Sequence, residues 1–518
     1  MKLKYYFLGF TLLSGIYSCV DDKGSYEQIP INEVTISGIE ENYTIVSGVT
    51  VLDIKPEITG TIKGSDDSYY KYTWYICKST LSDDHEHTII SNEKNLNQPI
   101  QLAPGTYNLY LAIHDEETGM EWRTSASIEA TTALMRGLYV MGDKADGTVG
   151  MDFITFASDT AVIQDIFINS TGLKGAEDLH FSGYYMFGAD TQTLQAVTSS
   201  GSYRITNTIE ENSRFDIDLS YDDDNTFFPT VEVKKTFKTL DIFPHQAAGG
   251  RTLNSASRGV VTEDAVYYSS IILGEAYANP INRYIAGSSE LFRPYQTIFY
   301  NGLYLRGIII YDLDNECFTA AVPVQYTLTN ATQCTQLTDR VGDVFPWNQT
   351  NRTIVYGENP INGYNSYALM KDLVDQSKFY VYRFMCYNAT PIKYYGGEIS
   401  TNEATNLDKA THYAFYTEQD VLLYTVGSQL WGYNYTTKKP ATMLKDFNSE
   451  ITYMAFERVS ASKSTDIAIA TYDSGSKGKI YKYNINNNPN TIEITPIDNC
   501  EWSTDLKVVK LEYRYSPF

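Results

Sequence analysis

One short segment has residue types that could bind a metal ion. Residues 84–87 read Asp-His-Glu-His, which places two imidazoles and two carboxylates within four positions. Alternate residues of a strand point to the same face, so His85 and His87 could share one ion. The alternative is a solvated loop between two strands, where polar residues are ordinary. Because polar loops of this kind are common, we predict no cofactor and keep His85 and His87 only as weak metal-ligand candidates.

The sequence lacks the local motifs of several common enzyme classes. It contains no G-x-S-x-G nucleophile elbow and no H-E-x-x-H helix. Residues 142–148 (GDKADGT) lack the Lys-Ser/Thr pair of a phosphate loop. Residues 312–316 (DLDNE) lack the central glycine of a calcium loop, and we expect them to turn a hairpin. His180, His245 and His412 lie far apart in the sequence, so whether any of them converge stays open.

Aromatic residues form the predicted ligand-binding surface. The chain has 44 tyrosines, and exposed aromatic residues mark sites where sugar rings or peptide side chains pack. Four aromatic residues lie beside proline or glycine, which favour loops over strands. These candidates are Trp347, Tyr295, Tyr364 and Tyr395. The alternative is that such rings fill the space between packed sheets.

The segments that carry these candidates repeat a two-stranded pattern. Residues 430–435 (LWGYNY) and 480–485 (IYKYNI) begin 50 positions apart (480 − 430), and each follows an apolar strand and a glycine-containing turn. A recurrence of about 40–55 residues with a hairpin in each unit is typical of a β-propeller. We therefore predict a β-propeller-like domain over residues 135–518, with about seven or eight blades. Two stacked β-sandwiches are the alternative.

Two local predictions concern this second region. Residues 137–156 have the same hairpin shape, and Asp146-Gly147 within them suits a type I′ turn. Residues 359–376 are the least strand-like stretch of a chain that otherwise indicates an all-β fold.

Residues 34–131 show the pattern of an immunoglobulin-like β-sandwich, with about seven short strands. Trp74, in the alternating strand 70–76 (YKYTWYI), is the predicted core aromatic residue. A second long strand, residues 106–114 (TYNLYLAIH), runs into a turn at 115–119. These segments resemble PKD-like domains, in which an extended strand ends in His or Val, followed by Asp and a turn.

The first residues have the order of a bacterial secretory signal. Lys2 and Lys4 precede the apolar run 5–13, which is too short to cross a bilayer as a helix. Cys19 lies where the lipidated cysteine of a lipoprotein signal lies, although the two residues at 16–17 depart from the usual pattern. We predict a signal peptide over 1–18, lipidation of Cys19 and a tether over 19–33; an ordinary cleaved signal is the alternative.

The acidic start after Cys19, followed by residues 31–39 (INEVTISGI), resembles the PKD-like lipoproteins of Bacteroidetes. This resemblance implies an outer-membrane lipoprotein facing the cell exterior, which binds or presents an oligomeric nutrient, glycan or peptide, to a SusC/SusD-type TonB-dependent importer. A surface glycan-degrading enzyme, hydrolase or lyase, with a propeller head is the alternative. The net charge of −23 argues against nucleic acid as a partner and restricts membrane contact to the lipid anchor.

Five cysteines remain besides Cys19, an odd number that cannot pair completely within one chain. Cys317 and Cys334 are close enough in sequence to form a disulfide. The alternative is that these cysteines are small buried apolar residues.

Overall fold

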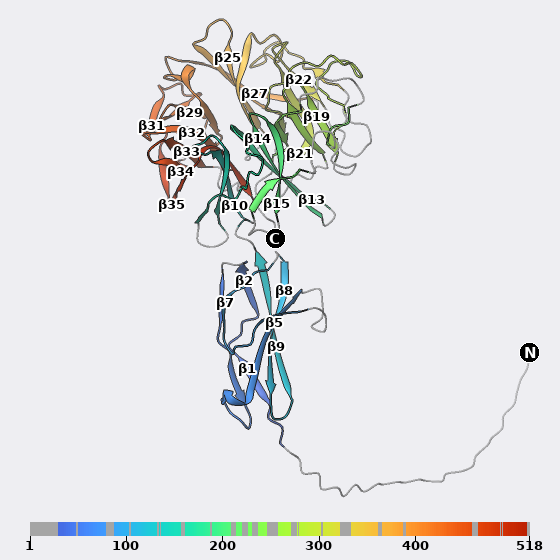
Figure 1. Ribbon diagram of the computed structural model, residues 1–518. Coiled ribbons are helices and arrows are strands. Elements are labelled where there is room, and N and C mark those ends of the chain that lie inside the picture. Colours follow the sequence, from blue (N-terminus) through green and yellow to red (C-terminus); the bar gives the residue numbers. More distant parts are fainter. Residues whose placement is uncertain are drawn as a thin grey trace, which may run out of the picture. The chain divides into compact units, whose positions relative to one another are not determined.

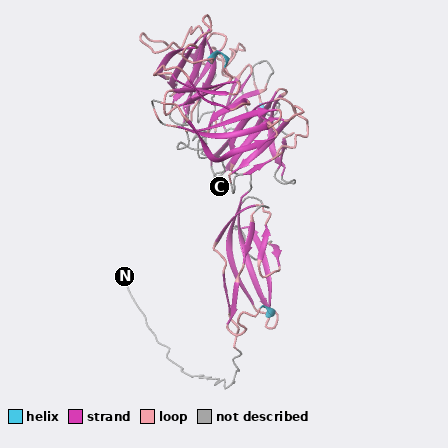
Figure 2. Cartoon of the chain, turned by 90° about the vertical axis from the view of Figure 1, so that its left-hand side faces the viewer, coloured by secondary structure: helices cyan, strands magenta, loops and turns pink. Residues whose placement is uncertain are grey.

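The chain folds into two compact units, residues 1–130 and 131–518, and strands dominate both (Figure 2). The computed structural model describes residues 30–514, and every structural statement below concerns the described residues. The gaps within that range are 48–49, 79–86, 103–104, 132–133, 135, 157–160, 187–188, 209–213, 220–225, 230–236, 246–256, 271–276, 278, 302–303, 322–332, 361–364, 387–389, 458–464, 487 and 489–490. No helix in this described part is long and apolar enough to cross a membrane.

The first unit is a β-sandwich, as the strand pattern predicted (Figure 1). Its main sheet has the order β2-β9-β8-β5-β6, from Asn42–Val46, Glu121–Thr131, Gly105–Asp115, Tyr70–Lys78 and Thr88–Ser91. Two further pairs are β1 (Val34–Ser37) with β4 (Glu57–Gly60), and β3 (Val51–Ile54) with β7 (Leu96–Pro99); a 3₁₀ turn, η1, spans Asp67–Tyr69. Trp74 is fully buried in the core, as predicted, and its indole nitrogen donates to the carbonyl oxygens of Glu93 (3.1 Å) and Lys94 (3.2 Å).

The aspartate that ends β8 explains the turn motif of this unit. The buried Asp115 carboxylate accepts from Lys63 Nζ at 2.8 Å and from the backbone N–H of Glu117 at 2.9 Å. Burial opposes a charge on Asp115, but these hydrogen bonds outweigh it and hold the pKa of Asp115 below its usual value. One carboxylate thus fixes the turn and neutralises the nearby lysine.

The second unit consists of seven sheets in its described residues. The first sheet combines β10 (Gly137–Asp143), β11 (Val149–Thr155) and β12 (Ala161–Ile163) with the last strand, β36 (Lys507–Arg514). The second and third sheets contain β13 (Ala176–Met186), β14 (Ala189–Thr198), β15 (Gly201–Thr208) and β16 (Arg214–Ile217), then β17 (Thr239–Phe243), β18 (Ser257–Thr262) and β19 (Val266–Ser270). The fourth and fifth contain β20 (Phe299–Asn301), β21 (Tyr304–Asp312), β22 (Cys317–Ala321) and β23 (Thr335–Gln336), then β24 (Arg352–Glu358), β25 (Asn365–Asp372), β26 (Lys378–Met385) and β27 (Ile392–Ser400). The sixth and seventh contain β28 (His412–Tyr416), β29 (Val421–Val426), β30 (Gln429–Asn434) and β31 (Thr442–Asp446), then β32 (Glu450–Phe456), β33 (Asp466–Asp473), β34 (Lys477–Ile485) and β35 (Ile494–Thr504); a 3₁₀ turn, η4 (Leu407–Lys409), precedes β28.

The two ends of this unit close a ring. Strand β36 pairs antiparallel with β10, and it contacts β32 on one side and β13 on the other. Strand β28 likewise contacts β32, and β13 contacts β17. The strand at one edge of each of these sheets, namely β36, β13, β17, β28 or β32, is thus next to the corresponding strand of the neighbouring sheet, and we call these edge strands the first strands. Sheets arranged in this way are the blades of a β-propeller. The predicted β-propeller-like domain is confirmed, the described residues form seven blades, and the alternative of two stacked sandwiches is wrong.

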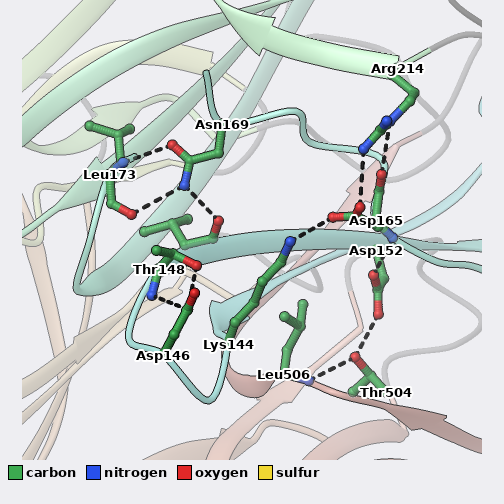
Figure 3. A network of polar contacts seen from close by, with 11 residues as sticks. Lys144, Asp146, Thr148, Asp152, Asp165, Asn169, Leu173, Arg214, Thr504 and Leu506 are labelled. Carbon is green, nitrogen blue, oxygen red and sulfur yellow. Dashed lines mark hydrogen bonds and ion pairs between the residues drawn. The ribbon is translucent and has the colours of Figure 1, made fainter. Parts of the chain in front are cut away.

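A polar network reinforces the closure (Figure 3). The Asp152 carboxylate, on β11, accepts from Thr504 Oγ1 at 2.6 Å, at the end of β35, and from the backbone N–H of Asp165 at 2.7 Å. The Asp165 carboxylate in turn binds Lys144 Nζ at 2.7 Å and Arg214 Nη2 at 3.1 Å. Burial raises the pKa of Asp152. The network therefore ties the first blade to both of its neighbours.

The local predictions divide into confirmed and wrong ones. The two repeated hairpins are present as β29–β30 and β33–β34. The β10–β11 hairpin also forms, but its turn is not type I′, because a type I′ turn needs two positive φ angles and only Gly147 (φ 78°) has one within residues 144–148. Residues 359–376 contain β25, whose buried residues 366–370 pack between sheets, so the low strand content expected there is wrong. Cys317 and Cys334 are free, buried thiols and form no disulfide.

Candidate functional site

A cavity of about 400 Å³ lies where the first strands of the blades meet. Its walls come from β10, β13, β24, β28, β32, β33 and β36 and from the segments after β17, before β20 and before β28. The aromatic residues that line it are Tyr295, Tyr356, Tyr413, Tyr453, Phe456 and Tyr513. The lining carboxylates are Glu177, Asp178, Glu358, Glu457 and Glu512, accompanied by Lys510, His245 and His412. Residues more than 300 positions apart in sequence (510 − 178) thus share one site.

An ion pair between β13 and β36 stands at the cavity wall. Lys510 Nζ lies 2.8 Å from Asp178 Oδ1. Burial opposes a charge on Asp178, but Lys510 and His180 outweigh it and hold the pKa of Asp178 below its usual value. Burial likewise opposes the charge on Lys510, and the Asp178 and Glu512 carboxylates overcome it and raise the pKa of Lys510. Both groups are therefore charged at neutral pH.

Two histidines that are distant in sequence meet beside this pair. His245 Nε2 lies 2.8 Å from Asp241 Oδ1, and His180 Nδ1 lies 3.7 Å from the same oxygen. The two imidazole rings are 6.2 Å apart. Burial opposes ionisation of Asp241, but His245 and His180 outweigh it and lower the pKa of Asp241. Asp241 and His245 are four positions apart at the end of β17, whereas His180 on β13 belongs to the neighbouring blade, so no local pattern in the sequence indicates the whole cluster.

His412 contributes a neutral polar group. Its Nδ1 lies 3.0 Å from Thr411 Oγ1 and 3.1 Å from Thr425 Oγ1. Burial lowers the pKa of His412 below its ordinary value of 6.5, so the ring is uncharged at neutral pH.

Most carboxylates of the lining are held by other groups of the protein. Glu177 pairs with Lys238 Nζ at 2.5 Å, and Glu457 forms a short contact with the buried Lys482. Glu358 accepts from the backbone N–H of Phe415 at 2.9 Å. These contacts fix the positions of the carboxylate oxygens, so the cavity presents oriented hydrogen-bond acceptors.

Three of the lining tyrosine hydroxyls also have hydrogen-bond partners, which fix their rings. Tyr295 donates to the carbonyl oxygen of Val355 at 3.2 Å, and Tyr453 donates to that of Leu511 at 3.1 Å. Tyr413 donates to the carbonyl oxygen of Ala410 at 3.0 Å. Rings held in this way lose little conformational entropy when a ligand packs on them.

The structure separates the four aromatic candidates. Tyr295 lies in a loop, as expected, and lines the cavity. Trp347 also lies in a loop but is 3% exposed, and its ring packs edge-on against Phe345 at 4.8 Å and against Phe318 at 5.4 Å. Trp347 therefore fills the core between blades. Tyr364 lies outside the described residues.

Tyr395 does not lie in a loop, which corrects the prediction from its glycine neighbours. It belongs to strand β27, and its hydroxyl donates to the carbonyl oxygen of Tyr435 at 3.0 Å. A Cβ at Gly397 would lie 2.0 Å from the Tyr395 hydroxyl. The glycine therefore makes room for the ring within the strand instead of forming a turn.

The weak metal candidates and the lipidation candidate are largely outside the described chain. His85 and Cys19 are not among the described residues. His87 is exposed, and its ring lies 4.8 Å from that of Tyr75. Across the described residues, no group of three or more His, Cys, Asp or Glu side chains is arranged to hold a metal ion.

The fold defines a two-unit protein, a PKD/Ig-like β-sandwich followed by a β-propeller. Residues 19–177 match the model of the PKD-like family, which spans the sandwich and the first strands of the propeller. No curated protein matches the sequence.

Solved structures of similar fold include proteins of Bacteroides. A quinonprotein alcohol dehydrogenase-like protein from Bacteroides thetaiotaomicron is 12% identical, with a TM-score of 0.37 over 93% of this chain and 99% of that one. A protein from Bacteroides uniformis, provisionally named a 6-phosphogluconolactonase, is 10% identical, with a TM-score of 0.43 over 73% and 99%. The WD40 domain of SCAP from fission yeast is 12% identical, with a TM-score of 0.32 over 70% and 90%. At these identities and TM-scores, none of them indicates what this chain does.

Proposed function

We propose that this protein is a lipid-anchored binding protein of the cell surface, whose propeller holds an oligomeric nutrient for an outer-membrane importer. The central cavity carries the proposal. Its volume of about 400 Å³ lies within the range of roughly 300–1,000 Å³ that small-ligand sites occupy. Fixed tyrosine rings and fixed carboxylate oxygens line it, which suits recognition of a ligand with flat faces and hydrogen-bonding groups.

The anchor and the partner rest on the sequence and on its resemblance to PKD-like lipoproteins. The PKD-like match begins at residue 19, the position proposed as the lipidated first residue of the mature chain. Several acyl chains on Cys19 would give stable anchoring. The acidic residues that follow resemble the start of outward-facing Bacteroidetes lipoproteins, which are associated with SusC/SusD-type importers. The sandwich would then act as a stalk and the propeller as the binding head.

A surface glycan-degrading enzyme is the second candidate, and the Asp241–His245 pair favours it. A carboxylate that holds an imidazole beside a cavity is the arrangement that orients a general base. Glycoside hydrolysis, however, also needs a carboxylic acid that stays protonated near neutral pH. Asp178 and Asp241 both have lowered pKa values, so neither suits that role. The fixed rings and fixed carboxylate oxygens of the lining support binding better.

Purification of the native lipoprotein from membranes, with its partners, tests the proposal. We expect a TonB-dependent importer to co-purify and the purified protein to leave oligosaccharides intact. Recovery without an importer, together with cleavage of an oligosaccharide by the purified protein, would favour the enzyme instead. Substitution of His245 by Gln would then abolish that cleavage, whereas it should not affect importer recovery.

A further inference from the structure

We propose that the central cavity binds an uncharged, hydroxyl-rich saccharide segment, in preference to an acidic polysaccharide or a cationic peptide. This inference rests on the proposed binding function and names its ligand class. It follows from the charge of the lining, the partners of the carboxylates and the positions of the aromatic rings.

The charge of the lining disfavours anionic ligands. Five carboxylates line the described part of the cavity, against one lysine, Lys510, which is already paired with Asp178. His412 is neutral at neutral pH. The whole chain carries a formal charge of −23, which adds to the repulsion of any polyanion. A uronic-acid chain would have to bring its carboxylates against this field, and the one ammonium group among the described lining residues, on Lys510, is already paired.

Three of the five lining carboxylates already have a cationic partner within the protein. Glu177, Asp178 and Glu457 each have an ammonium group of the protein as a partner. The partner of Glu457, Lys482, is buried, and its ammonium also lies 4.7 Å from the ring centre of Phe156. At these three positions a lysine or arginine side chain of a peptide would compete with the internal ion pairs.

The lining offers carboxylate oxygens that accept hydrogen bonds and the flat faces of tyrosine rings. A charged carboxylate accepts hydrogen bonds and donates none, and sugar hydroxyls are suitable donors. Tyr295, Tyr356 and Tyr413 present rings next to these oxygens, and the Tyr356 and Tyr413 rings are 5.7 Å apart. Apolar ring faces beside oriented acceptors match the two kinds of surface of a neutral sugar. The cavity volume of about 400 Å³ limits the contact to a short segment.

A glycan array with the mature chain tests this assignment. The array carries neutral malto-, xylo- and manno-oligosaccharides and oligogalacturonates, and tetralysine serves as the cationic peptide probe. We expect retention of at least one neutral oligosaccharide and none of the oligogalacturonates or tetralysine. In titrations with the retained oligosaccharide, Tyr413→Ala should weaken affinity about tenfold through the loss of the ring. Tyr413→Phe keeps the ring and should bind like the wild type.

A matched control and a second variant keep the test independent of folding. Tyr394, which is 47% exposed on β27 and does not line the cavity, provides Tyr394→Ala as a control that should leave affinity unchanged. If Tyr413→Ala does not fold, Tyr295→Leu in the loop replaces it, with the same expected loss. Equal affinity of the cavity variants and the wild type would overturn the site. Retention of oligogalacturonate or tetralysine, or of no neutral glycan, would overturn the ligand class, while co-purification with an importer decides the proposed function separately.

Discussion

Lys510 shows how a partner decides whether a partly buried charge is tolerated. Its ammonium lies on β36, the strand that closes the propeller, and Asp178 on β13 neutralises it at 2.8 Å. A buried ion pair adds little stability when compared with apolar residues, but removal of one member leaves the other uncompensated. Substitution of either Asp178 or Lys510 alone should therefore be costly, although the intact pair adds little stability.

Asp178→Asn should destabilise the propeller by about 1–3 kcal/mol, because Lys510 would lose its carboxylate while remaining largely buried. Urea unfolding of the full chain measures the change. The matched control is Glu450→Gln, which removes the exposed partner of Lys507 (3.0 Å) on the same strand. That control should cost less than about 0.5 kcal/mol. Equal losses in the two variants would contradict the account of the buried pair.

The pKa shifts predict that the folded state weakens in acid. Asp178 and Asp241 have lowered pKa values, so their contribution is present above the ordinary aspartate value of 3.8 and is lost as the pH falls through the folded-state values. His412 also has a lowered pKa, so below its ordinary value of 6.5 the unfolded state takes up the proton first and gains stability. The melting temperature should therefore fall in two stages between pH 7 and pH 3.

His412→Gln separates the two stages. This variant should flatten the decline between pH 7 and pH 5 and leave the steeper decline below pH 4, as measured by thermal melts in a pH series. The exposed His87 provides the matched control, and His87→Gln should keep the wild-type profile. An unchanged profile in His412→Gln would contradict the assignment of the first stage.

At the scale of elements, the pairing of β10 with β36 holds the ring closed. Gly142 on β10 makes this pairing possible, because a Cβ there would lie 2.3 Å from the carbonyl oxygen of Lys507. The Asp152–Thr504 hydrogen bond lies at the same closure. Strand pairing between the two ends therefore depends on a position where only a hydrogen atom fits.

Gly142→Ala should destabilise the propeller by about 1–3 kcal/mol, because either β36 or β10 must shift to relieve the overlap. Calorimetry on the full chain would show a lower melting temperature for the second unit. Gly475→Ala is the control, since its Cβ would meet only the side chain of Asp473, at 3.2 Å, in a turn. A melting temperature that Gly142→Ala leaves unchanged would contradict this view of the closure.

The sequence predicted those elements that depend on neighbouring residues. The hairpins β29–β30 and β33–β34 and the strand that holds Trp74 all follow from local alternation and turn residues. The pairing of Gly137 with Arg514 could not be read from local patterns, because these residues are 377 positions apart (514 − 137). Strand β25 was missed because its buried run Ser366–Met370 begins after a segment of Asn, Pro and Gly that suggests a loop.

The candidate site was only partly predictable for the same reason. Tyr295 was found because the preceding proline marks a loop, and that loop reaches the cavity. Trp347 carries the same kind of signal, yet its ring is buried between blades. Asp241 and His245 lie at the end of β17 and Lys510 lies on β36, and only the closed ring brings these distant strands together.

At the scale of the whole molecule, the proposed anchor predicts how the protein fractionates. Cys19→Ala should move the protein from the membrane fraction to the soluble fraction, because no acyl chain would be attached. Immunoblots of fractionated cells measure this. Protease treatment of intact cells should remove the propeller of the wild-type protein, and protection of the propeller would contradict an outward-facing position.

The central claim is that the ring of first strands forms a ligand-binding site, and a co-crystal structure tests it most directly. Crystals are grown with a saturating concentration of the neutral oligosaccharide that the array selects. The account predicts sugar density in the central cavity, with a ring against Tyr413 or Tyr295 and hydroxyls within hydrogen-bonding distance of the lining carboxylates. Density bound only outside the propeller centre, or on the sandwich, would contradict it.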